Sequence, residues 1–205
     1  VVCGAMFWAI TAGSSLGAQQ PAPPWYAQEI EAFQTSDRVN PPPPCSILFT
    51  GSSSIRLWDT LAADMAPAQV INRGFGGSTI ADVDDNFDRI VLPYRPKAIF
   101  FYAGENDLNS GKSAAQVFAG FQRFMILKSE TLGDTPVYFI SLKPSKLRFD
   151  QMARQSEVNA LVKQLAHKRR DLHFINVAAA MLDKGRLRNI YREDGLHMTR
   201  EGYRI

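Results

Sequence analysis

The sequence has few cysteines and histidines and no strong excess of charge, and each shortage excludes a class of protein. Its two cysteines in 205 residues cannot form a disulfide framework, and no Cys-x-x-Cys or His-Cys cluster indicates structural zinc. The 23 basic and 20 acidic side chains leave a net charge of only +3, which gives no reason to expect nucleic-acid binding. With 45% hydrophobic residues, the chain is long and apolar enough for one globular domain rather than disorder.

No hydrophobic run is long enough to cross a bilayer. A shorter apolar stretch lies at the start of the sequence. Residues 1–18, VVCGAMFWAITAGSSLGA, are apolar and then small, and no charged residue precedes Glu29. The run is shorter than the roughly 20 residues that cross a bilayer, so we expect a signal peptide and no stable membrane span. The predicted location is therefore secreted or periplasmic. Because neither an initiator Met nor a basic region precedes this stretch, we expect the reading frame to begin upstream.

A proline-rich lead segment, residues 19–45, follows the predicted signal peptide. Prolines cluster at 21–24 and 41–44, where they remove backbone donors and favour extended, linker-like chain. Between them, residues 25–33 (WYAQEIEAF) are predicted to form a short helix. No internal repeat indicates a second domain, so residues 46–205 are predicted to form the folded domain.

From residue 46 onward, short apolar runs alternate with segments of helical spacing. The runs at 47–51, 69–74, 98–104, 136–142 and 172–177 are typical of strands buried on both faces. Helical stripes occur between them, at 80–91 (Ile80, Val83, Phe87, Ile90, Val91), 117–125 and 158–165. Alternation of this kind predicts a parallel sheet with helices on both faces, an α/β/α sandwich with its ligand site at the carboxyl ends of the strands.

Three of these strand ends carry small or polar residues. The first is followed by three serines (TGSSSI, 50–55), where a hydroxyl can act as a nucleophile or can cap the helix that carries Trp58 and Leu61. The second is followed by NRGFGGST (72–79), which fails as a dinucleotide fingerprint because Thr79 stands where the last glycine is needed. The third is followed by Asn106 in GEND, whose amide can donate to an oxyanion or simply stabilise a turn.

The segment near the end of the sequence contains the one histidine with a chemical partner. Asp194 precedes His197 by three residues, close enough to hydrogen-bond the imidazole and fix its tautomer. His167 lies in a basic helical stretch and His173 in a predicted strand, and scattered histidines do not favour a metal site. Together the loops supply a nucleophile, a base, an orienting carboxylate and oxyanion donors, which is a complete set for acyl transfer.

In these blocks the sequence resembles the SGNH (GDSL-type) hydrolase superfamily, in particular bacterial members similar to platelet-activating-factor acetylhydrolase subunits. The resemblance runs over about residues 46–203 through ILFTGSSSIRLW, NRGFGGST, YAGENDL and DGLHMT. It implies a flavodoxin-like five-stranded sheet of order 2-1-3-4-5. It also implies site residues, namely Ser53 as nucleophile, Asp194 and His197 as its partners, and Ser53, Gly77 and Asn106 as the oxyanion hole.

Two positions depart from the family pattern. Ser52 replaces the usual Asp beside the nucleophile, which leaves the register among Ser52, Ser53 and Ser54 open. The family continues beyond the Asp-x-x-His block into a helix that covers the sheet, whereas this sequence ends at Ile205, so we expect that helix to be absent.

The resemblance implies a serine esterase that cleaves carboxylic esters with short acyl or acetyl groups, without metal or organic cofactor. The expected partner is a small-molecule, lipid or glycan ester. Two alternatives stay open: an O-acyltransferase acting on glycans, and a non-catalytic glycan- or phosphate-binding module in which the serine only caps a helix. The sequence does not determine the acyl chain length, the alcohol or the oligomeric state.

Overall fold

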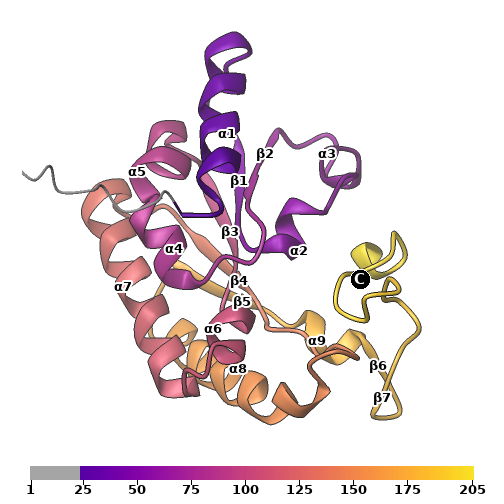
Figure 1. Cartoon of the computed structure of the whole chain (residues 1–205). Helices are drawn as coiled ribbons and strands as arrows, with labels where there is room; N and C mark the ends of the chain where they lie inside the picture. Colours follow the sequence, from indigo (N-terminus) through magenta and orange to yellow (C-terminus); the bar gives the residue numbers. More distant parts are fainter. Residues whose placement is uncertain (1–23) are drawn as a thin grey trace, which may run out of the picture.

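The computed structural model describes residues 24–205, so the predicted signal peptide (1–18) lies outside the described residues and stays a prediction. A five-stranded parallel sheet in the order β2-β1-β3-β4-β5 forms the centre of the fold (Figure 1). All five predicted strands and the predicted order are confirmed. The strands are β1 (Ile47–Gly51), β2 (Val70–Gly74), β3 (Ala98–Tyr102), β4 (Val137–Ile140) and β5 (Leu172–Ile175).

Helices flank the sheet, as the alternating pattern predicts (Figure 1). On one face, Phe101 of β3 and Phe139 of β4 pack against Phe121 and Phe124 of α7 (Ala114–Leu132). α8 (Met152–Ala166) packs against α7 and β5. These two helices contain the stripes predicted at 117–125 and 158–165.

The opposite face of the sheet carries a row of rings, one from each of four adjacent strands. The rings are stacked with centroids 4.5, 4.7 and 4.6 Å apart, and the row consists of Phe49, Phe100, Tyr138 and His173. Trp58 packs edge-on against Phe49, which is 1% exposed, whereas His173 at the other end is exposed. This face is therefore well covered beside β1 and increasingly open toward β5.

The helix predicted from the stripe at 80–91 is divided into two. α4 (Ile80–Asp85) and α5 (Phe87–Ile90) meet at Asn86, whose side-chain amide donates to the Asp82 carbonyl over 2.9 Å. An asparagine side chain that bonds the backbone competes with the helical pattern, which accounts for the break. The apolar stripe itself stays on the buried side, with Val83 and Phe87 in the core.

The helix predicted in the lead segment is longer than the sequence pattern indicates and packs on the domain. α1 spans Ala27–Val39, buries Ile30 completely and contacts α5. Asp37 near its end accepts hydrogen bonds from Arg73 of β2 and from Tyr94. The second half of the lead segment is thus anchored to the edge of the sheet by apolar contacts and by an ion pair.

The remaining helices and strands are short, and the last of them lie in the C-terminal segment. They are α2 (Ser53–Arg56), α3 (Leu61–Asp64), α6 (Glu105–Asn109), α9 (Val177–Ala180), the hairpin β6 (Leu182–Asp183) and β7 (Arg186–Leu187), and 3-10 turns at Leu92–Tyr94, Phe149–Gln151 and Gly202–Arg204. Four residues of the C-terminal segment form a small apolar cluster of their own, namely Met181, Ile190, Tyr191 and Met198. Among residues 24–205, no helix has the length and apolar character to cross a bilayer.

Candidate active site

The loop after β1 places Ser53 at the carboxyl edge of the sheet. Gly51 ends the strand with φ +125°, and a Cβ there would stand 1.9 Å from the Tyr102 carbonyl oxygen, so a residue with a side chain does not fit. The next backbone N–H, from Ser52, donates to that same carbonyl over 2.8 Å. β1 and β3 therefore approach closely at this point, and the chain turns directly into α2, of which Ser53 is the first residue.

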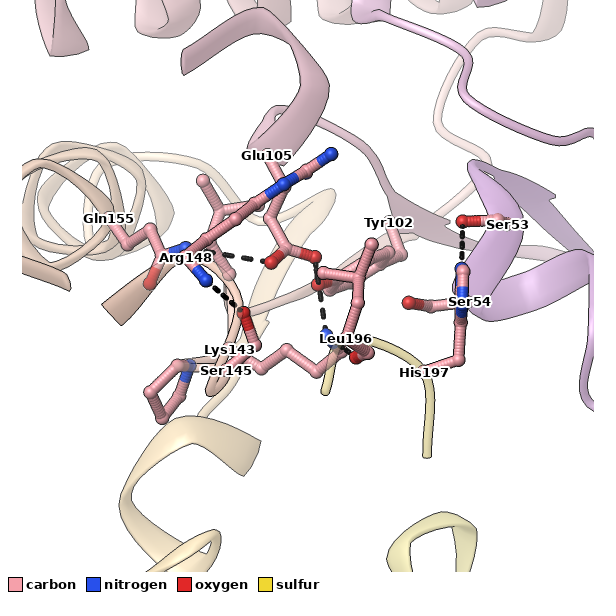
Figure 2. Close-up of polar contacts among 12 residues, drawn as sticks. Ser53, Ser54, Tyr102, Glu105, Lys143, Ser145, Arg148, Gln155, Leu196 and His197 are labelled. Carbon is pink, nitrogen blue, oxygen red and sulfur yellow. Dashed lines mark hydrogen bonds and ion pairs between the residues drawn. The ribbon is translucent and has the colours of Figure 1, made fainter. Parts of the chain in front are cut away.

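Ser53, His197 and Asp194 form a continuous hydrogen-bonded chain. Ser53 Oγ lies 2.8 Å from His197 Nε2, and His197 Nδ1 lies 2.6 Å from Asp194 Oδ2 (Figure 2 shows the first contact). Of the three consecutive serines, Ser53 is the one that contacts the imidazole; Ser52 and Ser54 are buried. His167 and His173 lie elsewhere, at the end of α8 and on β5.

The negative charge of Asp194 sets the tautomer of the His197 imidazole. Partial desolvation raises the pKa of Asp194, but hydrogen bonds from the His197 ring and from the Leu196 and His197 backbone N–H groups outweigh it and lower the pKa to about 2. The carboxylate is thus ionised near neutral pH, and it accepts a hydrogen bond from the protonated Nδ1 atom of His197. In neutral His197 the Nε2 atom then has a free lone pair, which faces the Ser53 hydroxyl.

The other two predicted site residues meet through the loop after β2. The Asn106 Nδ2 atom donates to the Ser78 carbonyl over 2.9 Å, and Ser78 directly follows Gly77. The Asn106 Oδ1 atom accepts from Arg148 Nη2 over 3.0 Å, so both ends of the amide are held. Gly77 adopts φ +62°, which favours glycine. Within residues 24–205, no hydrogen bond joins Ser53 directly to Gly77 or Asn106.

A buried polar cluster beside this site was not predicted from the sequence. Lys143, just after β4, lies 3.5 Å from Glu105 Oε2 and donates to the Leu196 carbonyl over 2.9 Å (Figure 2). The Tyr102 hydroxyl donates to the same Glu105 oxygen, and burial followed by the Glu105 charge raises the pKa of Tyr102 well above its usual value. The sequence signal for this cluster is a charged residue directly after each of two predicted apolar runs, namely Glu105 after 98–104 and Lys143 after 136–142.

The arrangement supplies a polarised hydroxyl, a base and an orienting carboxylate at the sheet edge where ligands bind in open α/β folds. Among the described residues 24–205, no three His, Cys, Asp or Glu side chains gather as a metal-binding group. The chemistry that this arrangement can perform is nucleophilic attack by an oxygen, assisted by proton transfer to an imidazole.

Solved structures of other proteins share this fold. A candidate platelet activating factor from Streptococcus pneumonia has a TM-score of 0.75 at 22% identity, covering 88% of this chain and 90% of that one. A GDSL-like lipase from Bacteroides thetaiotaomicron has a TM-score of 0.69 at 20% identity, with 85% and 91% covered. A variant of an acetyl-xylooligosaccharide esterase from Geobacillus Stearmophilus has a TM-score of 0.63 at 14% identity, with 78% and 90% covered.

No curated protein matches the sequence. The family model of the GDSL-like Lipase/Acylhydrolase family, in contrast, matches residues 46–205, the whole of the predicted folded domain. That match confirms the resemblance found in the sequence blocks, and it favours an ester hydrolase over a non-catalytic binding module. The chain belongs to the GDSL-like lipase/acylhydrolase family, whose members hydrolyse ester substrates.

Proposed function

We propose that the protein is a serine esterase in which Ser53 is the nucleophile, His197 the general base and Asp194 the residue that orients the base. The observation that carries this proposal is the hydrogen-bonded chain from Ser53 Oγ through His197 to Asp194, with contacts of 2.8 and 2.6 Å. Two such contacts in series supply what an activated serine needs, a base within reach of the hydroxyl and a carboxylate that stabilises the imidazolium.

In the first half of the reaction, Ser53 Oγ attacks the carbonyl carbon of the ester while its proton passes to His197 Nε2. The tetrahedral intermediate collapses when the C–O bond to the alcohol breaks and His197 gives its proton to the departing oxygen. This leaves the acyl group on Ser53. Water then attacks the acyl-enzyme, again giving a proton to His197, and the acid is released as Ser53 recovers its proton.

Negative charge on the carbonyl oxygen requires donors, and we assign these to the N–H groups of Ser53 and Gly77 and to the Asn106 side chain. An amide nitrogen carries two hydrogens, and the Ser78 carbonyl uses one of the two on Asn106. Arg148 holds the opposite end of the same amide, which fixes its orientation. The second hydrogen of Asn106 is therefore the one available to the oxyanion.

The acyl group is proposed to be short, acetyl or a close homologue, carried on a small-molecule, lipid or glycan alcohol. One structural neighbour is named as an acetyl-xylooligosaccharide esterase, which makes acetyl esters of oligosaccharides the first natural substrates to test. A series of p-nitrophenyl esters from acetate to decanoate measures the preference for chain length. A kcat/KM that is highest for acetate supports the assignment, and one that rises steadily with chain length contradicts it.

Labelling of the intact protein with a fluorophosphonate tests the nucleophile directly, because the probe forms an adduct with an activated serine. Peptide mass spectrometry is expected to find the adduct on Ser53. Ser53→Ala should abolish both labelling and p-nitrophenyl acetate hydrolysis, whereas the matched controls Ser52→Ala and Ser54→Ala should still be labelled. A folded parent protein without any adduct, or an adduct on Ser52 or Ser54, would refute the assignment.

A further inference from the structure

The cluster of Tyr102, Glu105 and Lys143 is buried beside the proposed active site but takes no part in the proposed chemistry. Lys143 is 1% exposed, Glu105 4% and Tyr102 2%. Burying charge is costly, and a buried ion pair contributes little net stability compared with apolar residues of the same size. Gln155, which lies 3.5 Å from Glu105, even leaves its Oε1 atom without a partner among the described residues. Stability alone is therefore a weak explanation for this cluster.

What the cluster holds is the peptide directly before His197. The Lys143 ammonium donates to the Leu196 carbonyl over 2.9 Å, while the Asp194 carboxylate accepts from the Leu196 N–H over 2.8 Å. Both the carbonyl and the N–H group of Leu196 are thus hydrogen-bonded to side chains (Figure 2 shows the bond from Lys143). A neighbouring contact, from the Leu147 N–H to the Gly195 carbonyl over 3.0 Å, holds the same loop at one further point.

We propose that Lys143 is a positioning residue for the base, with Glu105 balancing its charge and Tyr102 orienting Glu105. This inference rests on the proposed function, since it concerns the placement of His197. The Lys143 ammonium fixes the Leu196 carbonyl, and this fixes the direction in which the chain enters His197. The imidazole is then held where Nε2 lies 2.8 Å from Ser53 Oγ.

The cluster also joins two sequence blocks that each carry a proposed site residue. Glu105 directly precedes Asn106, the proposed oxyanion donor, and Leu196 directly precedes His197. One buried ammonium between them sets the spacing of the base relative to the oxyanion hole, because Lys143 contacts both segments. Precise placement matters because small displacements of a catalytic group lower rates strongly.

A second buried lysine offers a matched control. Lys128 is fully buried, pairs with Asp171 and donates to the Gly133 carbonyl over 3.0 Å, the same pattern as Lys143. Asp171 lies just before β5, at the amino edge of the sheet, whereas the proposed site lies at the carboxyl edge. Removing this second pair disturbs the fold in a comparable way without touching the loop of His197.

The test compares Lys143→Met/Glu105→Gln with Lys128→Met/Asp171→Asn. The first double variant removes the bond to Leu196 and leaves no unpaired buried charge. We expect its kcat on p-nitrophenyl acetate to fall about 10- to 100-fold, with KM changed less than about threefold. Fluorophosphonate labelling should slow by a similar factor, and amide hydrogen exchange of residues 190–199 should accelerate. The control should keep its kcat and the exchange rate of that segment.

Glu105→Gln alone keeps Lys143 but leaves its buried ammonium without a counter-charge. Its kcat should therefore fall as well, because an unpaired buried ammonium is costly and holds the Leu196 carbonyl less firmly; an unchanged kcat would contradict the role given to Glu105. If Lys143→Met/Glu105→Gln does not fold, Lys143→Gln/Glu105→Gln replaces it, since glutamine keeps a polar group there but is one bond shorter than lysine.

Unchanged kcat in the folded double variant would overturn the proposal. So would an equal loss in the control. Failure of the proposed function looks different, because the parent protein itself would then show no fluorophosphonate adduct on Ser53.

Discussion

Asn106→Ala is the substitution that best tests the proposed oxyanion hole. The change removes one N–H donor from the position where negative charge develops, and loss of one such donor raises the barrier by about 2.7 to 4 kcal/mol. We therefore expect kcat on p-nitrophenyl acetate to fall about 100- to 1,000-fold. KM should change little, because the interaction strengthens only as the oxyanion forms.

The substitution also removes two hydrogen bonds, to the Ser78 carbonyl and from Arg148. At about 0.5 to 1.5 kcal/mol each, these cost about 1 to 3 kcal/mol of folding free energy. A loss of that size lowers the midpoint of thermal unfolding by several degrees and leaves the variant folded at 25 °C. Kinetics at 25 °C together with a thermal melt separate the catalytic loss from the structural one.

Asn109→Ala is the matched control for this experiment. Asn109 lies on the same short helix, α6, and its Oδ1 accepts from Gln151 over 2.9 Å, so its removal disturbs the helix without touching the oxyanion. Its kcat should stay within about twofold of the parent. The reasoning fails if Asn106→Ala retains the parental kcat, or if Asn109→Ala loses as much as Asn106→Ala.

Three further predictions follow from the contacts. Asp194→Asn should lower kcat about 1,000- to 10,000-fold in the same assay, because an amide can stabilise the wrong tautomer of His197; a loss below tenfold would contradict the role of Asp194. Arg148→Ala should lower kcat about tenfold, by freeing the Asn106 amide to rotate, and an unchanged kcat would exclude that role. Arg169 holds the pKa of the Asp171 carboxyl well below its usual range despite partial burial, and Lys128 reinforces the effect. Asp171→Asn should therefore be less stable to urea at pH 7, with the gap closing as the pH falls below about 4; a gap independent of pH would refute this.

The strands could be predicted from the sequence because each is a continuous apolar run that ends in small or polar residues. Their order followed from the family resemblance rather than from the runs themselves. The helix at 80–91 was predicted as one element because its apolar stripe is unbroken from Ile80 to Val91. The break depends on the hydrogen bond from Asn86 to the Asp82 carbonyl, and spacing of apolar residues contains no information about that contact.

The candidate site was predictable to the extent that each of its parts is a local pattern at a strand end. Gly51 and the serines, Asn106, and the Asp194–His197 pair are all visible as short motifs. Lys143 and Arg148 were missed because their partners lie far away in sequence; Lys143 contacts Leu196, 53 residues later, and Arg148 contacts Asn106, 42 residues earlier. Glu105 stands inside a recognised block, yet its partner Lys143 lies in none.

The C-terminal segment packs in a way that separates two effects of a substitution: its effect on the placement of His197 and its effect on the stability of the fold. His197 stands beside a small apolar cluster that includes Ile190 and Met198 and is distinct from the main core of the sheet. Polar contacts reach from this segment to the rest of the domain, among them Tyr191 to the Pro144 carbonyl at 2.7 Å and Tyr203 to the Ser54 carbonyl at 2.9 Å. Removing only the hydroxyl of Tyr191 or Tyr203 breaks such a contact while the ring stays packed in the cluster or on Trp58, so the loss costs the core little. A change at one of them should therefore lower kcat more than it lowers the unfolding temperature, which is the opposite of the effect of a cavity in the main core.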